Sequence, residues 1–135
     1  MREPKPTANI NGSGVLISEP DGRVWLVKPT NEFGGYRYTF PKGKLDKGLT
    51  LRDNAIKEAL EETGLLVKII GYAGDFAGDT GTTRYYHAKR IGGSPLNYGW
   101  ETEAVVLVPR CELDQYLNRT RDKNIAAQHL NFQEK

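Results

Sequence analysis

The chain has 135 residues, which is the usual size of one domain and too short for a second independent core. Hydrophobic residues make up 38% of it and charged residues 27%, a balance that excludes disorder, collagen and coiled coil as descriptions of the whole chain. The formal net charge of +2 does not predict a nucleic-acid-binding protein, because such proteins usually carry a strong basic excess.

The apolar stretches and the single cysteine bear on where the protein works. No apolar run approaches the roughly 20 residues that a membrane helix needs, and the amino-terminal residues lack the apolar core of a secretion signal. Cys111 cannot form an internal disulfide, which fits a reducing compartment, and with no His or Lys close to it we expect a buried, inert thiol. We therefore expect a cytoplasmic protein with no membrane partner; its oligomeric state is left open, a homodimer included.

The first third of the chain predicts a leader followed by strands. Residues 1–7 contain two prolines and three charged residues, so we expect a flexible leader in front of one domain over 8–135. Residues 9–18 and 24–27 are rich in Val, Ile and Leu and flank a Pro-Asp-Gly turn, which predicts a hairpin. A short strand is expected at 38–40, where Pro41 would stop it.

The pattern then changes to that of a helix. Thr50 with Asp53 three residues later approximates a capping box, and Gly64 stands where a helix commonly ends. At about 100° per residue, four apolar residues form one stripe that we expect to face a core: Ala55, Ile56, Ala59 and Leu60.

The second half predicts further strands and a helical end. The expected strands are 65–72, 82–89 and 102–108, separated by glycine-rich loops at 74–81 and 92–95. Helical segments are expected at 112–117 and 123–130, with a break near residues 119–120. Strands on both sides of one central helix, with a further helix at the end, predict an α/β fold in which a mixed sheet carries helices on its faces.

Three glutamates on the predicted helix form the strongest chemical signal. Glu58, Glu61 and Glu62 stand at i, i+3 and i+4, so they share one face, and like charges at this spacing favour a positive partner. A hard cation such as Mg²⁺ would supply it, since carboxylates are its preferred protein ligands; the alternative is a solvated acidic face. The segment Pro41-Lys-Gly-Lys44 runs into this helix with Lys47-Gly48 behind it, and its backbone N–H and ammonium groups are suited to a polyphosphate.

Here the sequence resembles the Nudix hydrolases. The family box runs G, five residues, E, seven residues, then R-E-U-x-E-E-x-G-U with U aliphatic; Gly43 opens it and residues 57–65 close it, so that seven of the nine specified positions agree. The resemblance implies a Nudix fold, with a mixed β-sheet sandwiched between α-helices. It also implies hydrolysis of a phosphoanhydride bond in a nucleoside diphosphate linked to another moiety.

Two positions depart from the box. Leu49 replaces its first glutamate, which in the family supports the loop and helix, and Lys57 replaces the arginine that orients the catalytic carboxylates. Lysine donates as a point charge and lacks the planar fork of arginine. We expect Leu49 to lie against apolar surface and Lys57 to reach an acid or a carbonyl. The departures motivate an alternative, a catalytically silent Nudix domain that binds a nucleotide or a protein.

The resemblance also implies roles for individual residues. The metal, Mg²⁺ or Mn²⁺, would be held by Glu58 and Glu62, with Glu61 as a ligand through water or as a base. The full set of metal-site candidates is Gly43, Glu58, Glu61 and Glu62, and the catalytic candidates are Glu58, Glu61, Lys57, Glu101 and Glu103. Glu101 and Glu103 are the nearest candidates outside the box for the general base, because they stand just before the apolar run 104–108; the alternative for both is a solvated loop.

Substrate recognition is less well specified by the sequence. Lys42, Lys44, Arg84 and Tyr86 are the substrate-binding candidates, although strand alternation would turn only one of Tyr85 and Tyr86 toward a cleft. Tyr36, Arg37, Phe76 and Trp100 would frame a nucleotide or belong to the core and rim. The partner expected is a nucleotide-type small molecule: a diadenosine polyphosphate, ADP-ribose, a nucleoside triphosphate, a diphosphoinositol phosphate, or nucleic acid only as a capped RNA end.

Overall fold

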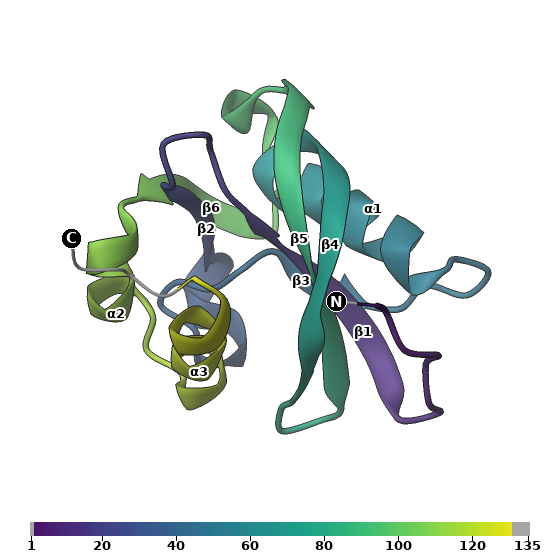
Figure 1. The fold of residues 1–135 in the computed structure, drawn as a ribbon. Helices are drawn as coiled ribbons and strands as arrows, with labels where there is room; N and C mark the ends of the chain where they lie inside the picture. Colours follow the sequence, from purple (N-terminus) through teal and green to yellow (C-terminus); the bar gives the residue numbers. More distant parts are fainter. Residues whose placement is uncertain (1, 131–135) are drawn as a thin grey trace.

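The computed structural model describes residues 2–130, which form two sheets and three α-helices in layers (Figure 1). A four-stranded sheet has the order β3-β1-β5-β4, and a two-stranded sheet pairs β2 with β6. The strands are β1 (Ile10–Ile17), β2 (Val24–Pro29), β3 (Lys42–Lys44), β4 (Leu65–Ala77), β5 (Thr82–Gly93) and β6 (Thr102–Val108). The helices are α1 (Leu51–Thr63), α2 (Leu113–Tyr116) and α3 (Thr120–His129), with 3₁₀ turns at Thr30–Gly35, Pro95–Asn97 and Arg110–Glu112.

The larger sheet is mixed and is covered on both faces. β1 runs parallel to β5 and antiparallel to β3, and β4 pairs antiparallel with β5. Figure 1 shows α1 on one side of this sheet and β2, β6, α2 and α3 on the other. β1 is buried on both faces at its end, where the three consecutive apolar residues 15–17 replace alternation: Val15 and Ile17 pack toward α1, and Leu16 packs toward the opposite core. The expected sheet between helices is confirmed.

Helix α1 begins and ends where the sequence predicts. The Thr50 hydroxyl accepts a hydrogen bond from the backbone N–H of Asp53, and Gly64 takes the left-handed conformation, with φ of 76°, that closes the helix. The predicted apolar stripe is wrong at one edge. Ala55 and Ala59 are fully buried, but Leu60 is 47% exposed, because the helix is rotated so that Asn54 and Glu58 face inward instead.

Three strand predictions need correction. The predicted hairpin is wrong beyond one bridge between Ser18 and Val24, because β2 pairs with β6 and lies in a different sheet from β1. The segment 38–40 is not a strand, since only Thr39 forms a bridge, to Val27. The neighbouring segment Lys42–Lys44, expected to be a loop, is β3, because its backbone pairs with Gly12–Gly14 of β1. β4 and β5 also extend beyond their predicted ends, through Gly74 and through the pair Gly92-Gly93, and register shifts along β4 absorb the irregular pairing.

The predictions for the two ends of the chain agree with the structure to different degrees. The predicted break before the last helix is confirmed at residues 117–119, although α3 begins at Thr120, three residues earlier than expected. Residues 2–7 contain no helix or strand, and Glu3 makes specific contacts with the body of the protein. The domain limit of 135 stays a prediction, since 131–135 lie outside the described residues. Within 2–130, no helix has both the length and the apolar composition of a membrane span.

Candidate active site

The carboxylate of Glu58 lies directly against the backbone of Gly43. A Cβ at position 43 would overlap that carboxylate, so the close approach of β3 to α1 requires glycine there. Asn54, fully buried on α1, holds the same loop: its amide nitrogen donates to the Gly43 carbonyl over 3.4 Å, and its side-chain oxygen accepts from the Asp46 N–H over 3.0 Å. One helix therefore fixes both the carboxylate and the loop that faces it.

Glu62 lies one turn further along α1, at the edge of β3. Its carboxylate accepts a hydrogen bond of 3.2 Å from the backbone N–H of Lys42. Burial raises the pKa of Glu62, and the charges of Glu58 and Glu101 raise it further, while Lys42 opposes the shift. Burial likewise raises the pKa of Glu58, against the opposing charge of Lys57. Two neighbouring carboxylates are thus held where their charged forms are disfavoured, an arrangement that a cation would stabilise.

Glu61 occupies a different position, turned toward Lys57. The Nζ atom of Lys57 lies 2.9 Å from Glu61, 2.8 Å from Asp46 and 3.5 Å from Glu58. The expected reach of Lys57 to an acid is therefore confirmed. Across residues 2–130, no three acidic, histidine or cysteine side chains gather closely enough to surround a metal ion. The donors on α1 that fit a hard cation are the carboxylate oxygens of Glu58 and Glu62, and Glu58 lies against the backbone of Gly43.

Leu49, at the position of the missing box glutamate, lies half-buried at an apolar hollow of about 560 Å³. Ile10, Leu45 and Leu51 line the same hollow, as expected for a residue that packs on apolar surface near the helix start. Lys57 pairs instead with Asp46, which stands three residues before Leu49 in the chain.

The two general-base candidates have different surroundings. Glu101 is close enough to Glu62 for its charge to raise the pKa of that carboxylate. The carboxylate of Glu103 lies 3.5 Å from Nζ of Lys28 on β2. Of the two, only Glu101 is brought to the carboxylates of α1.

The substrate-binding candidates are divided between two regions. Lys42 lies beside Glu62 and extends its Nζ over the ring of Tyr36, 3.9 Å from the ring centroid, while Lys44 is exposed at the end of β3. Arg84 and Tyr86 are fully buried on the α1 side of the sheet, where Arg84 binds Asp75 and both side chains donate to Glu3. The structure does not bring these two residues to the carboxylates.

Several residues near the site carried no signal in the sequence. Asn54 is polar within an amphipathic helix, and Asp46 is an unremarkable loop acid, so only the fold shows that they hold Gly43 and Lys57. Arg119, just before α3, and Arg121 and Asp122, in its first turn, lie near Tyr36 although they are more than 80 residues away in sequence. The prediction of a buried Cys111 is wrong, because its side chain is exposed on the turn before α2.

An acid-bearing helix packed against Gly43 of β3, beside a mixed sheet, agrees with a protein of the Nudix type. The family model for the NUDIX domain matches residues 9–129, and the chain belongs to that family.

The relatives agree with this assignment. An RNA pyrophosphohydrolase of Caulobacter vibrioides is 41% identical over 59 residues, which are 43% of this chain and only 34% of the relative's length. A NUDIX hydrolase from Nitrosomonas europaea has a TM-score of 0.75 at 14% identity, covering 89% of this chain and 88% of that one. An Ap4A hydrolase from C. elegans has a TM-score of 0.70 at 16% identity, covering 85% and 92%. At these identities the structural likeness shows the fold alone.

Proposed function

We propose that the protein is a metal-dependent pyrophosphohydrolase that cleaves a phosphoanhydride bond in a nucleoside diphosphate linked to another moiety. The observation that supports it most is the pair Glu58 and Glu62, a buried and a partly buried carboxylate with raised pKa values, set against Gly43 and Lys42. The names of the relatives, an RNA pyrophosphohydrolase and an Ap4A hydrolase, are consistent with this class of bond.

The proposed chemistry assigns a task to each residue. Glu58, Glu62 and the Gly43 carbonyl would hold Mg²⁺ or Mn²⁺, which when bound neutralises phosphate oxygens and lowers the pKa of water. Lys42 and Lys44 would bind the phosphate oxygens as point charges. Glu101 would accept the proton of the attacking water; the new P–O bond forms from that water, the anhydride P–O bond breaks, and the second phosphate leaves. Lys57 would position Glu58 and Glu61 without touching the substrate.

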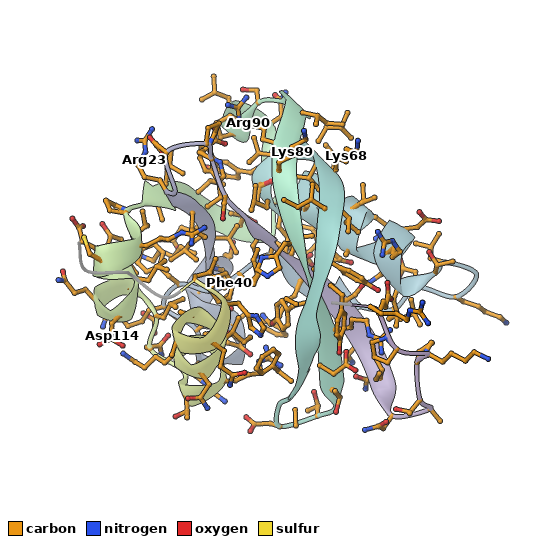
Figure 2. All side chains as sticks on the ribbon, in the orientation of Figure 1. Arg23, Phe40, Lys68, Lys89, Arg90 and Asp114 are labelled. Carbon is orange, nitrogen blue, oxygen red and sulfur yellow. The ribbon has the colours of Figure 1, made fainter. Side chains whose placement is uncertain are left out.

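The test is product release from a panel of substrates with Mg²⁺, with Mn²⁺ and with EDTA. Diadenosine tetraphosphate, ADP-ribose, a nucleoside triphosphate and a 5′-triphosphorylated oligonucleotide cover the expected range. We expect turnover that EDTA abolishes, and a loss of at least about a hundredfold in Glu62→Gln and Glu58→Gln. Asp114→Asn, an exposed carboxylate on α2 (Figure 2), is the matched control. Full activity of Glu62→Gln would overturn the proposal, and tight binding without turnover would establish the silent alternative.

Glu101 and Glu103 form a matched pair for the general base. Glu101→Gln should lower kcat by about a hundredfold with little change in KM, since general base catalysis contributes on that scale. Glu103→Gln should leave kcat unchanged, because the carboxylate of Glu103 is paired with Lys28. Equal losses in both variants would refute the assignment of the base to Glu101.

A further inference from the structure

Three cationic side chains from distant parts of the chain surround the ring of Tyr36. Nζ of Lys42 lies 3.9 Å from the ring centroid and the guanidinium carbon of Arg119 lies 5.4 Å from it, while a terminal nitrogen of Arg121 donates to the Tyr36 hydroxyl over 2.8 Å. They come from β3, from the residue before α3 and from the first turn of α3. Bringing three like charges together opposes folding unless anions are close by.

The backbone of two loops is shaped to admit the arginines. A Cβ at Gly35 would lie 2.7 Å from a terminal nitrogen of Arg119, and one at Gly78 would lie 2.6 Å from a terminal nitrogen of Arg121. Arg119 also donates to the Gly34 carbonyl. Gly78, Arg119 and Arg121 line a hollow of about 540 Å³, together with Tyr36, the end of β4 and the start of α3. The volume is ample for a phosphate group together with part of a nucleotide.

Polar groups at the buried side of this cluster are not satisfied by the protein. Tyr85 and Asp122 are fully buried, and within residues 2–130 the Tyr85 hydroxyl, Oδ1 of Asp122 and Nε of Arg121 have no hydrogen-bond partner. Arg119, at the N-cap position of α3, provides no side-chain acceptor for the backbone N–H groups of the first turn. Nε of Arg121 and Oδ1 of Asp122 lie 3.8 Å apart as an ion pair. Buried polar groups are normally paired, so the Tyr85 hydroxyl is the donor at this cluster that suits a polar ligand.

The acid that now holds Arg119 is easily displaced. Asp79 accepts a hydrogen bond of 2.6 Å from Arg119, but its side chain is 81% exposed and stands on the 78–81 loop. Exposed ion pairs of this type contribute little free energy. A phosphate would offer Arg119 a bidentate partner of greater charge, so Asp79 is placed as a competitor that occupies the site when no phosphate is bound.

We propose that Arg119 and Arg121, with Lys42 and Tyr36, form a second anion site that binds a phosphate of the substrate other than the pair whose anhydride bond is cleaved. Lys42 connects the two sites, because its backbone N–H donates to Glu62 while its Nζ lies over Tyr36. The claim that this site binds a substrate phosphate rests on the proposed function. The existence of the anion site does not, because it is tested by binding without turnover. The preferred substrates then carry a third phosphate, either further along a polyphosphate chain or between two nucleotides.

The test is equilibrium binding of inorganic tripolyphosphate in EDTA at fixed ionic strength, by calorimetry. Arg119→Gln should weaken binding about tenfold, the scale of a lost charge-assisted contact. Asp79→Asn should strengthen it about threefold, because the competing carboxylate is gone. Arg23→Gln is the control, since Arg23 lies at the far end of β2 from α3 (Figure 2) and pairs only with the exposed Asp21 among the described residues.

Arg119→Gln should weaken tripolyphosphate binding and Asp79→Asn should strengthen it, and these opposite effects distinguish ligand binding from a purely structural role. If Arg119 and Asp79 only hold two loops together, Asp79→Asn lowers thermal stability and leaves tripolyphosphate affinity unchanged, which would overturn the proposal. Both residues are at least partly exposed, so these variants should fold even where substitution of the more buried Arg121 does not. Equal affinity of Arg119→Gln and the parent protein would also overturn it.

Competition then identifies the source of the phosphate. Displacement of tripolyphosphate by diadenosine tetraphosphate assigns the site to a longer polyphosphate chain, and displacement by a 5′-triphosphorylated dinucleotide but not by the mononucleotide triphosphate assigns it to an internucleotide phosphate. Displacement by neither would overturn the assignment to a substrate. Full metal-dependent turnover in Glu62→Gln, tested separately, would refute the proposed function without affecting the anion site.

Discussion

Lys57 contacts three carboxylates at once, and this explains how a departure from the family box is accommodated. Its Nζ lies within 3 Å of Asp46 and Glu61 and 3.5 Å from Glu58. The hydrogen bond to Asp46 is the strongest of the influences that raise the pKa of Lys57. Leu49 contributes apolar packing at the helix start, and Asp46 supplies the acid that the box glutamate would have provided. The supporting ion pair has therefore been moved by three residues.

A double-mutant cycle tests this relocation. Asp46→Asn and Lys57→Gln should each lower metal-dependent turnover about threefold, because the pair is partly exposed and such pairs are weak. The double variant should be no slower than Lys57→Gln alone, since residues in contact couple. Lys47→Gln, exposed on the same loop, serves as the control. Strictly additive losses in the double variant would show that Asp46 does not act through Lys57.

Gly43 provides a sharper test of geometry at a single residue. In Gly43→Ala the new methyl group would overlap the carboxylate of Glu58, so either the loop or the carboxylate must move. A displacement of about 1 Å at a catalytic group costs on the order of a hundredfold in rate, and we expect a loss of that size in kcat. Gly71→Ala on β4 is the matched control, because nothing lies within 4 Å of its Cβ position. Near-normal turnover of Gly43→Ala would contradict the close packing.

Among the helices and strands, the features set by neighbouring residues could be predicted from the sequence. Those that depend on pairing with distant residues could not. The ends of α1 follow from Thr50 and Gly64, which act on their own backbone. The buried face of α1 could not be predicted as well, since the inward position of Asn54 depends on Ser13 of β1, 41 residues away. β3 was missed for the same reason: Lys42–Lys44 has no strand pattern, and only pairing with β1 makes it a strand.

The turn between β1 and β2 provides a prediction about pH at this scale. Glu19 accepts hydrogen bonds from Arg90 of β5 and from Trp25 of β2, and the bonds from Arg90 do most to lower its pKa, to about 2 from an ordinary value of 4.5. Because the folded protein favours the charged form, this stabilisation is fully present above pH 4.5 and disappears as the pH falls toward 2.

Glu19→Gln should therefore be less stable than the parent protein at pH 7, by about 1 kcal/mol, which is the usual contribution of one such hydrogen bond. The difference should vanish near pH 2. Urea denaturation at both pH values measures it, and Asp21→Asn, in the exposed part of the same turn, controls for the loss of a negative charge. A difference that persists unchanged at pH 2 would refute the role of the carboxylate charge.

For the whole molecule, the layered arrangement separates two regions with different tasks. The core between the four-stranded sheet and α1 supports the carboxylates, and the core between that sheet and α2, α3, β2 and β6 positions the Tyr36 cluster. Phe40, labelled in Figure 2, lies in the second core beside Tyr85. The sequence predicts the first region because the residues of the family box lie within one stretch of the chain. For the second region the sequence singles out Lys42 and Tyr36, but it could not predict that two arginines at the start of α3 join them.

The amino-terminal segment joins the first of these regions through a single carboxylate. Glu3 accepts hydrogen bonds from Tyr86 over 2.6 Å, from Arg52 over 2.7 Å and from Arg84 over 2.9 Å. Burial opposes the charge on Glu3, but these three hydrogen bonds outweigh it and lower the pKa of the carboxyl. Arg84 is fully buried, and its other carboxylate partner is Asp75. A buried guanidinium that loses one of its partners is expensive.

Glu3→Gln should therefore lower the free energy of unfolding by about 1–3 kcal/mol at pH 7, because Arg84, Arg52 and Tyr86 all lose a charged acceptor. Since the folded protein favours the ionised form of Glu3, the difference should shrink as the pH falls below the ordinary carboxyl pKa of 4.5. Lys5→Gln, exposed on the same segment, should unfold like the parent protein. Metal-dependent turnover should change little in the variant at temperatures where it is folded, because the side-chain partners of Glu3 among the described residues are Arg52, Arg84 and Tyr86 and not the carboxylates of Glu58 and Glu62. Unaltered stability of Glu3→Gln would mean that the segment does not hold Arg84 in solution, and that residues 1–7 are the flexible leader that their composition predicts.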